Sequence, residues 1–219
     1  MTAIPTPAPA GLDELVAWLR AGGLAGKPPV AHSNQGELYR HRLGENEFII
    51  KTPLGNPLAW RLRRSTLKRE FSAYRRLDSV PGFATCHGLV DERWLILDFI
   101  EGRPFRDGPP PDPERFFSQL LAVIQAMHER GVAHGDLKRK SNLLVDRHGQ
   151  PVILDLGTAI VRKPGWRPLN RRLFEFIRQT DLNAWVKLKY GGYREIGAAD
   201  LAYLKRSRLE RILGRMRRG

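Results

Sequence analysis

The chain is organised around one stretch that joins polar side chains to two short apolar runs. Its polar part is residues 134–142, and the apolar run 143–145 follows directly. A second apolar run, 152–154, comes after a segment dense in turn formers, which predicts a hairpin of two short strands. The hairpin would bring three polar side chains to one end of a sheet: Asp136, Asn142 and Asp155.

Two carboxylates and one carboxamide in this arrangement suit the transfer of a phosphoryl group. That reaction needs little covalent help from a protein, because positioning the hydroxyl and spreading charge onto metal ions lower most of the barrier. Asp136 is the candidate catalytic residue that accepts or orients the proton of the attacking hydroxyl. Asn142 and Asp155 offer the hard oxygen ligands that Mg²⁺ prefers. The stretch therefore predicts a site for Mg²⁺ and ATP.

These residues resemble the protein-kinase-like superfamily, whose catalytic loop reads His-Arg-Asp-Leu-x-x-x-Asn and whose metal-binding motif reads Asp-Phe-Gly. Gly135 replaces the arginine, which looks like the RIO kinases and the aminoglycoside and lipopolysaccharide kinases. Because those kinases lack the arginine that reads activation-loop phosphorylation, the resemblance implies that such control is absent here. Leu156 replaces the phenylalanine that acts as a switch, so constitutive competence is the simpler hypothesis.

The spacing of the catalytic loop departs from the superfamily motif by one residue. Asn142 lies six residues after Asp136, one further than usual, and Ser141 occupies the usual place. Either the loop bulges or the metal ligand is Ser141. A group of short bacterial kinase-like proteins has a similar extra residue, which favours the bulge.

Lys138 is a second candidate catalytic residue, by resemblance alone. Serine/threonine protein kinases carry a lysine two residues after the aspartate, where it contacts the γ-phosphate. The alternative is that Lys138 belongs only to a basic triplet, residues 138–140, in a basic protein.

The resemblance implies an α+β, bilobal protein-kinase-like fold with a β-rich N-lobe and a minimal helical C-lobe. It divides the chain into an N-terminal tail and short helix at 1–29, the N-lobe at 30–103, and the C-lobe with a basic helical tail at 104–219. No Ala-Pro-Glu motif follows Asp155. The 219 residues suffice to bury a core without disulfides, and the single cysteine, Cys86, has no intrachain partner.

Residues 30–40 take the position of a kinase nucleotide loop between the first two strands. Only one of the usual three glycines remains, so the segment looks more like the polar loop of RIO kinases. Its candidate cofactor-binding residues are Ser33, Asn34 and Gly36, around which backbone amides would cap the phosphates. A plain hairpin turn is the alternative.

A lysine and a glutamate complete the expected nucleotide site. The β-branched run 47–52 places Lys51 on an otherwise apolar strand, where it is the best candidate to bind the α- and β-phosphates. Glu70 lies in the helix predicted over 59–77 and fits, in order and separation, the glutamate that pairs with this lysine in kinases. The alternative is a surface charge on a basic helix.

Strands are also predicted at 86–90 and 94–100. By resemblance the second of these leads into the hinge between the lobes. Backbone groups from Asp98 to Ile100 would hydrogen-bond the adenine there, and such contacts leave no residue signature of base specificity.

Apolar periodicity predicts helices over 11–20, 112–130, 168–190 and 198–218, the third of these as one or two helices. The first is expected to pack on the N-lobe. His128 is expected to be a packing residue of the second helix. His134 is expected to hold the catalytic loop by hydrogen bonds to backbone rather than to act as a general base.

The net charge of +14 is concentrated near the C-terminus. Residues 1–159 carry 21 Lys/Arg against 18 Asp/Glu, whereas residues 160–219 carry 16 against 5. This excess favours an anionic partner such as membrane lipid, lipopolysaccharide or RNA, with a solvated helix face as the alternative. No basic n-region and no run long enough to span a bilayer is present, which predicts a cytoplasmic protein, peripheral at the inner membrane if the tail binds lipid.

The hypothesis from sequence is an ATP- and Mg²⁺-dependent phosphotransferase, RIO-like, acting on serine or threonine of a protein. One alternative keeps the chemistry and takes a sugar hydroxyl of the lipopolysaccharide core as acceptor. Another is a non-catalytic ATP-binding pseudokinase scaffold, whose bulged loop and glycine-poor nucleotide loop no longer support transfer.

Overall fold

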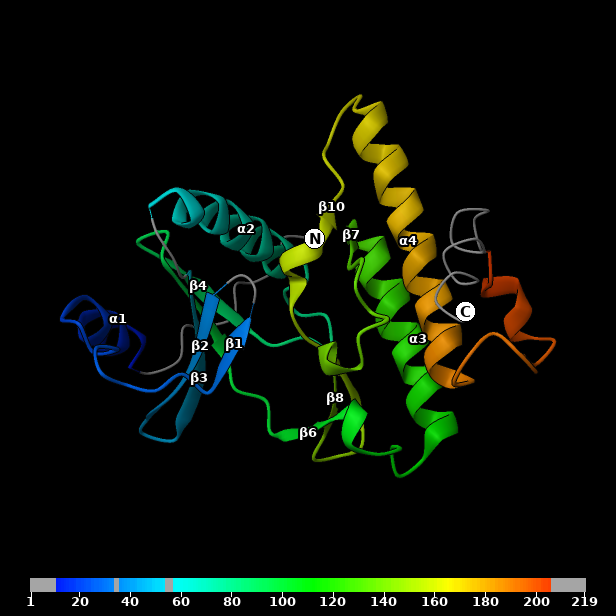
Figure 1. Cartoon of the computed structure of the whole chain (residues 1–219), viewed down its shortest axis with the longest axis horizontal. Coiled ribbons are helices and arrows are strands. Elements are labelled where there is room, and N and C mark those ends of the chain that lie inside the picture. The colour runs from blue at the N-terminus through cyan, green and yellow to red at the C-terminus, as the bar shows by residue number, and fades with distance from the viewer. Residues whose placement is uncertain (1–10, 34–35, 54–56, 206–219) are drawn as a thin grey trace. The chain divides into compact units, whose positions relative to one another are not determined.

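The computed structural model describes residues 11–33, 36–53 and 57–205, with the backbone alone at 32–33 and 57–63. The chain forms two compact units (Figure 1). Unit 1 comprises residues 1–78 and 84–100, and unit 2 comprises residues 79–83 and 101–219. Strands are antiparallel throughout the described sheets, and the predicted α+β, kinase-like fold class is confirmed.

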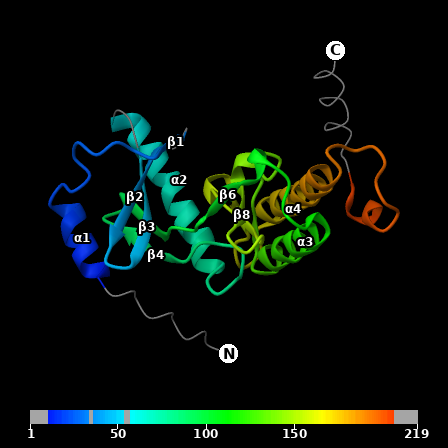
Figure 2. The same cartoon turned by 90° about the horizontal axis from the view of Figure 1, so that it is seen from below.

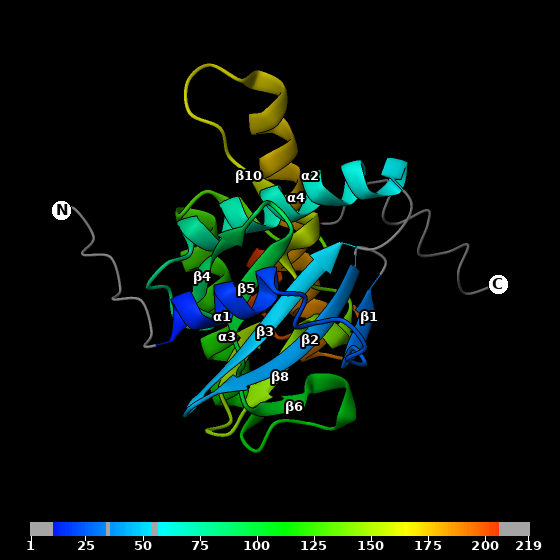
Figure 3. The ribbon, with the colours of Figure 1, turned by 90° about the vertical axis from the view of Figure 1, so that its left-hand side faces the viewer.

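Unit 1 is built on a five-stranded sheet with the order β1-β2-β3-β5-β4. Its strands are β1 (Ala31–Ser33), β2 (Gly36–Leu43), β3 (Asn46–Pro53), β4 (Cys86–Val90) and β5 (Trp94–Asp98). The helix α1 (Leu12–Arg20) lies across this sheet (Figure 3) and buries Leu15 and Leu19 against Phe48 and Ile50. The predicted docking of this helix on the first lobe is confirmed.

The alternation of side chains along β3 decides which groups face the second helix of unit 1. Because Phe48 and Ile50 face α1, the next residue, Lys51, points to the opposite face of the sheet. That face is contacted by α2 (Pro57–Arg76), which buries Leu67 and Tyr74, and Leu77, directly after the helix, is buried too. Glu70 falls within the same helical stripe and is also buried.

Unit 2 is built around two helices, α3 (Pro113–Glu129) and α4 (Pro168–Lys189), which lie side by side (Figures 1 and 2). Asp112 caps α3 by accepting a hydrogen bond from the Arg115 backbone N–H at 3.1 Å, and Pro113 occupies the first helical position, as the sequence predicts. The buried Trp185 of α4 donates its indole N–H to the Phe117 carbonyl at 2.8 Å and so ties the helices together.

Short strands connect and flank these helices. They form a three-stranded sheet with the order β6-β8-β9 and a pair, β10-β7. The strands are β6 (Gly102–Pro104), β7 (Val132–Ala133), β8 (Leu143–Asp146), β9 (Pro151–Ile153) and β10 (Ile160–Val161).

The helix predicted over 198–218 is wrong in its described part, and residues 206–219 lie outside the described residues. Only a short 3₁₀ turn, Asp200–Tyr203, forms there. The Asn183 amide bonds both the N–H of Lys205 at 3.0 Å and its carbonyl at 3.1 Å, and Gln179 donates to the Tyr203 carbonyl at 2.9 Å. Side chains of α4 thus take the backbone groups that a helix would pair internally. Within the described residues, no helix has the length and apolar character needed to cross a bilayer.

Candidate active site

The predicted hairpin is present as β8 and β9, paired with Leu143 opposite Ile153. One residue beyond this pair, the Leu154 N–H donates to the Asn142 carbonyl at 2.9 Å. Asn142 and Asp155, the residue after Leu154, therefore come from adjacent segments at the same end of the hairpin. At the other end, the Asp146 carboxylate accepts from the backbone N–H groups of His148 at 2.8 Å and Gln150 at 2.7 Å. This aspartate fixes the turn and therefore the register that aligns the two polar ends.

A 3₁₀ turn over Lys140–Asn142 accommodates the extra residue of the loop. The buried Asn142 amide donates from Nδ2 to the Asp136 carbonyl at 3.1 Å and lies 3.4 Å from the Asp136 carboxylate oxygen Oδ2. Ser141 is exposed, and its hydroxyl lies 3.5 Å from Asn142 Oδ1. The group held against Asp136 is therefore the Asn142 amide rather than the Ser141 hydroxyl.

The imidazole ring of His134 holds the loop by hydrogen bonds to backbone groups, as predicted. Its Nδ1 accepts a hydrogen bond from the Asp136 N–H at 3.1 Å, and its Nε2 lies 2.9 Å from the Leu154 carbonyl. One ring nitrogen must accept and the other must donate, so the neutral ring with the proton on Nε2 satisfies both contacts. The ring thereby links the residue before Asp155 to the backbone of Asp136.

Asp181 is the residue of this site that the sequence reasoning missed. It is fully buried in α4, and its two oxygens accept from the backbone N–H groups of His134 at 2.7 Å and Gly135 at 2.8 Å. His128 Nε2 lies 3.1 Å from the same carboxylate, so this predicted packing residue is buried and also hydrogen-bonded. The signal was available: Asp181 falls in phase with Phe174 and Leu188 on the buried stripe of α4, where an unpaired acid is costly.

Asp155 has a left-handed backbone, with φ of 61° and ψ of 75°. This conformation costs a residue with a Cβ atom about 1–2 kcal/mol. The 3₁₀ turn Leu156–Thr158 follows it, and Leu156 is fully buried. Backbone strain of this kind clusters at functional sites, where surrounding contacts maintain it.

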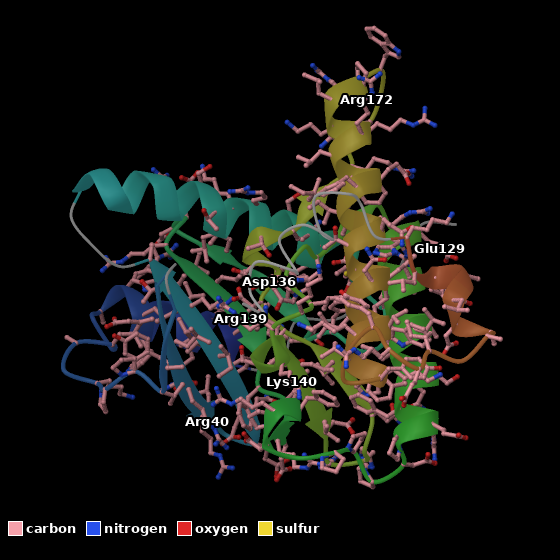
Figure 4. The ribbon with its side chains drawn as sticks, turned by 45° about the vertical axis from the view of Figure 1, so that its right-hand side comes forward. Arg40, Glu129, Asp136, Arg139, Lys140 and Arg172 are labelled. Atoms are coloured by element: carbon pink, nitrogen blue, oxygen red, sulfur yellow. The ribbon has the colours of Figure 1, made fainter. Side chains whose placement is uncertain are left out.

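Asp136 remains partly open, with 35% of its side chain exposed. Arg139 Nε lies 3.5 Å from its Oδ2, and Figure 4 shows the two side chains close together on the loop. Because Arg139 is itself 60% exposed, this pair is weak and leaves the carboxylate available. Lys138 is half-buried on the same loop and is engaged in an interaction of its own.

In unit 1 the predicted lysine–glutamate pair is present. Lys51 Nζ lies 2.5 Å from Glu70 Oε1, and both side chains are buried. Strand β3 supplies the lysine from the middle of the sheet, between Leu38 of β2 and Leu95 of β5. A buried pair of this kind is costly to break, because either partner alone would leave an uncompensated charge.

The nucleotide-loop prediction is only partly covered by the described residues. Ser33 ends β1, Asn34 lies outside the described residues, and Gly36 begins β2. A Cβ atom at Gly36 would collide with the Thr52 carbonyl of the neighbouring strand. The packing of the hairpin thus accounts for this glycine without reference to a phosphate.

The predicted hinge residues end the first unit. The N–H of Asp98 donates to the Thr85 carbonyl at 2.9 Å, and that of Phe99 donates to the Glu47 carbonyl at 2.8 Å. Burial alone would raise the pKa of the Asp98 carboxyl, but hydrogen bonds from His87 and Thr85 outweigh burial and hold the pKa below its usual value. Since these two N–H groups are occupied, a base bound here would use the carbonyls or the N–H of Ile100.

Comparisons with known proteins bear on the same residues. No family model matches the chain. CBL-interacting protein kinase 25 of Oryza sativa subsp. japonica is 30% identical over 147 residues, which cover 59% of this chain and 28% of that protein. The serine/threonine-protein kinase chk1 of Schizosaccharomyces pombe is 39% identical over 74 residues, covering 31% of this chain and 15% of that protein. The chain is homologous to serine/threonine protein kinases.

KIN4 of Saccharomyces cerevisiae, also a serine/threonine-protein kinase, is 28% identical over 143 residues, covering 56% of this chain and 18% of that protein. The chain thus spans less than a third of the length of each of these kinases. The homology agrees with the predicted resemblance at the level of the protein-kinase-like superfamily. None of these three relatives bears the name of a RIO or lipopolysaccharide kinase, so the finer resemblance stays a prediction.

Proposed function

We propose that this protein is an ATP- and Mg²⁺-dependent phosphotransferase, RIO-like, that transfers the γ-phosphate to serine or threonine of a protein. The observation that carries the proposal is the hydrogen bond from Asn142 Nδ2 to the Asp136 carbonyl at 3.1 Å. This bond holds Asn142, the candidate metal ligand, against Asp136, the candidate base, although the loop between them has one residue more than the kinase motif. Homology to serine/threonine protein kinases supports the same chemistry.

In this proposal Asp136 orients the acceptor hydroxyl and receives its proton, for which its partly exposed carboxylate is suited. Asn142 suits a metal ligand because its Nδ2 is bonded to Asp136, which leaves Oδ1 as the oxygen for a cation. Asp155 would supply a carboxylate ligand. Bound Mg²⁺ would neutralise charge on the phosphates.

The remaining candidates have roles in binding the nucleotide. Lys51, oriented by Glu70, would bind the α- and β-phosphates, and Lys138 would contact the γ-phosphate. Backbone groups around Ser33, Asn34 and Gly36 would cap phosphates, and those from Asp98 to Ile100 would bind adenine.

The test measures transfer of label from γ-labelled ATP with Mg²⁺ to two acceptors, a generic basic protein and purified lipopolysaccharide. Transfer by the wild type that is lost in Asp136→Asn supports the enzyme, and the labelled acceptor identifies the substrate class. Asp107→Asn is the matched control, because Asp107 is 52% exposed in the same unit and forms an exposed ion pair with Arg106.

The lipopolysaccharide core is the second candidate acceptor because residues 160–219 carry 16 Lys/Arg against 5 Asp/Glu, which suits an anionic substrate. If neither acceptor is labelled by the wild type while ATP still raises its melting temperature, further acceptors are tested next, and failure to label any of them supports an ATP-binding scaffold.

A further inference from the structure

The segment that leads into α4, together with the first turns of that helix, forms an exposed surface that the proposed chemistry does not use. We call residues 162–173 with Phe176 the α4 amino-terminal surface. Every residue from 162 to 173 is exposed except Asn170, which is half-buried. The exposed fractions of its large apolar residues are 91% for Trp166, 79% for Leu169, 45% for Leu173 and 51% for Phe176.

Helix α4 carries two separate apolar stripes. At about 100° per residue, Leu169, Leu173 and Phe176 fall within about 60° of one another on the helical wheel. Phe174, Asp181 and Leu188 fall about 100° or more from Leu169 and are buried. Because the buried stripe already packs against α3, the exposed stripe is additional to what the fold requires.

The charge of this surface has one sign. Residues 156–174 contain five Lys/Arg and no Asp/Glu, and all five lie within the surface: Arg162, Lys163, Arg167, Arg171 and Arg172. Figure 4 shows Arg172 near the end of α4 that projects past the other helix of unit 2. The surface is therefore basic and carries large exposed apolar side chains between its cationic residues.

We propose that the α4 amino-terminal surface binds the face of an anionic phospholipid bilayer, independently of the proposed phosphotransfer. Trp166, Leu169 and Leu173 enter the headgroup boundary, where tryptophan is favoured, while the flanking arginines pair with lipid phosphates. A second copy of the chain fits less well, because two such surfaces would oppose five like charges each. RNA would satisfy the charge and leave the apolar stripe in water.

The test uses the full chain and extruded vesicles of either phosphatidylcholine alone or an equal mixture with phosphatidylglycerol. Co-sedimentation gives the partition coefficient at two salt concentrations. One variant, Trp166→Ser/Leu169→Ser, removes apolar anchors, and another, Arg171→Glu/Arg172→Glu, reverses charge. Each has a matched control on exposed residues elsewhere: Val30→Ser/Leu201→Ser and Arg106→Glu/Arg147→Glu.

The proposal expects binding to the mixed vesicles that weakens with salt and little binding to phosphatidylcholine alone. The apolar variant should lose about tenfold or more in partition coefficient, and the charge variant about thirtyfold or more. Both controls should stay within about twofold of the wild type. Brominated phosphatidylglycerol should quench a component of the tryptophan emission that is missing in Trp166→Phe, a variant that still binds.

Three results would overturn the proposal. Wild-type binding of both the apolar and the charge variant would mean that cationic residues elsewhere carry the attraction. Equal binding to both vesicle types would exclude recognition of anionic lipid. A wild-type dimer that dissociates in Trp166→Ser/Leu169→Ser, with no vesicle binding, would make this surface an interface between copies.

Discussion

Replacing Asp181 with asparagine tests whether a buried carboxylate holds the candidate catalytic loop. The two oxygens of Asp181 serve three donors: Oδ2 lies near His134 N and His128 Nε2, and Oδ1 near Gly135 N. An asparagine keeps the shape but offers one oxygen. With that oxygen placed where Oδ2 lies, the new NH₂ group faces the Gly135 N–H, which loses its acceptor.

The expected cost follows from counting these contacts. Leaving the Gly135 N–H unsatisfied costs about 1–3 kcal/mol. The bonds to His134 and His128 change from charge-assisted to neutral, which weakens each by about half. We therefore expect Asp181→Asn to lower the free energy of unfolding by about 2–4 kcal/mol and to abolish label transfer by displacing Asp136.

Hydrogen exchange detected by mass spectrometry, on peptides covering residues 130–140, is the direct assay. A loss of 2–4 kcal/mol corresponds to a fall in amide protection of about 30- to 1000-fold at His134 and Gly135. Glu175→Gln on the same helix is the control, because its pair with Arg178 is about half exposed and is expected to contribute less than about 1 kcal/mol. Unchanged protection in Asp181→Asn, with stability lowered by less than about 1 kcal/mol, would refute this account of the loop.

Two substitutions and one labelling experiment test other parts of the molecule. Lys51→Met should lower stability by about 3–5 kcal/mol in denaturant melts, because it leaves buried Glu70 without its cation, and should abolish ATP-dependent labelling; retained labelling would contradict the assigned role. Gly36→Ala should destabilise by more than about 1 kcal/mol because its Cβ collides with backbone, whereas Gly192→Ala, which has open space, should be near neutral. Burial raises the pKa of the Cys86 thiol to about 12, so at pH 8 iodoacetamide should react about 100-fold or more slowly with native than with unfolded protein, and equal rates would contradict this burial.

Local sequence signals predicted the elements of the site because each was encoded over a few residues. The hairpin followed from two apolar runs around a turn, and Asp146 closes that turn through the backbone of residues 148 and 150. The pairing of Lys51 with Glu70 followed from their order on a strand and the next helix. For the loop before Asn142, spacing alone could not decide between a bulge and Ser141 as the ligand, and only the resemblance to short bacterial kinase-like proteins favoured the bulge; a 3₁₀ turn over Lys140–Asn142 takes up the extra residue.

Contacts between distant segments could not be read in the same way. Asp181 meets the loop 47 residues earlier in the chain, so only its place on an apolar stripe hinted at a buried role. Gly36 was taken as a remnant of a phosphate loop, yet its close approach to Thr52 depends on the pairing of β2 with β3. The failed helix at 198 likewise depends on Asn183 and Gln179, which capture backbone beyond the end of α4.

Gly135, which stands where the kinase motif has arginine, also has a backbone conformation that suits glycine. Its φ of +84° is unfavourable by about 1–2 kcal/mol for any residue with a Cβ atom, and such an atom would lie 3.4 Å from Ile177. Its N–H is also held by Asp181 at 2.8 Å, directly before Asp136. An arginine at 135 would therefore strain the segment that orients the candidate base, whereas glycine lets the buried carboxylate fix it without that strain. By resemblance, the glycine at 135 takes the place of the arginine that reads activation-loop phosphorylation. The same glycine also lets Asp181 hold the loop without backbone strain, which favours a site that forms on folding and needs no phosphorylation.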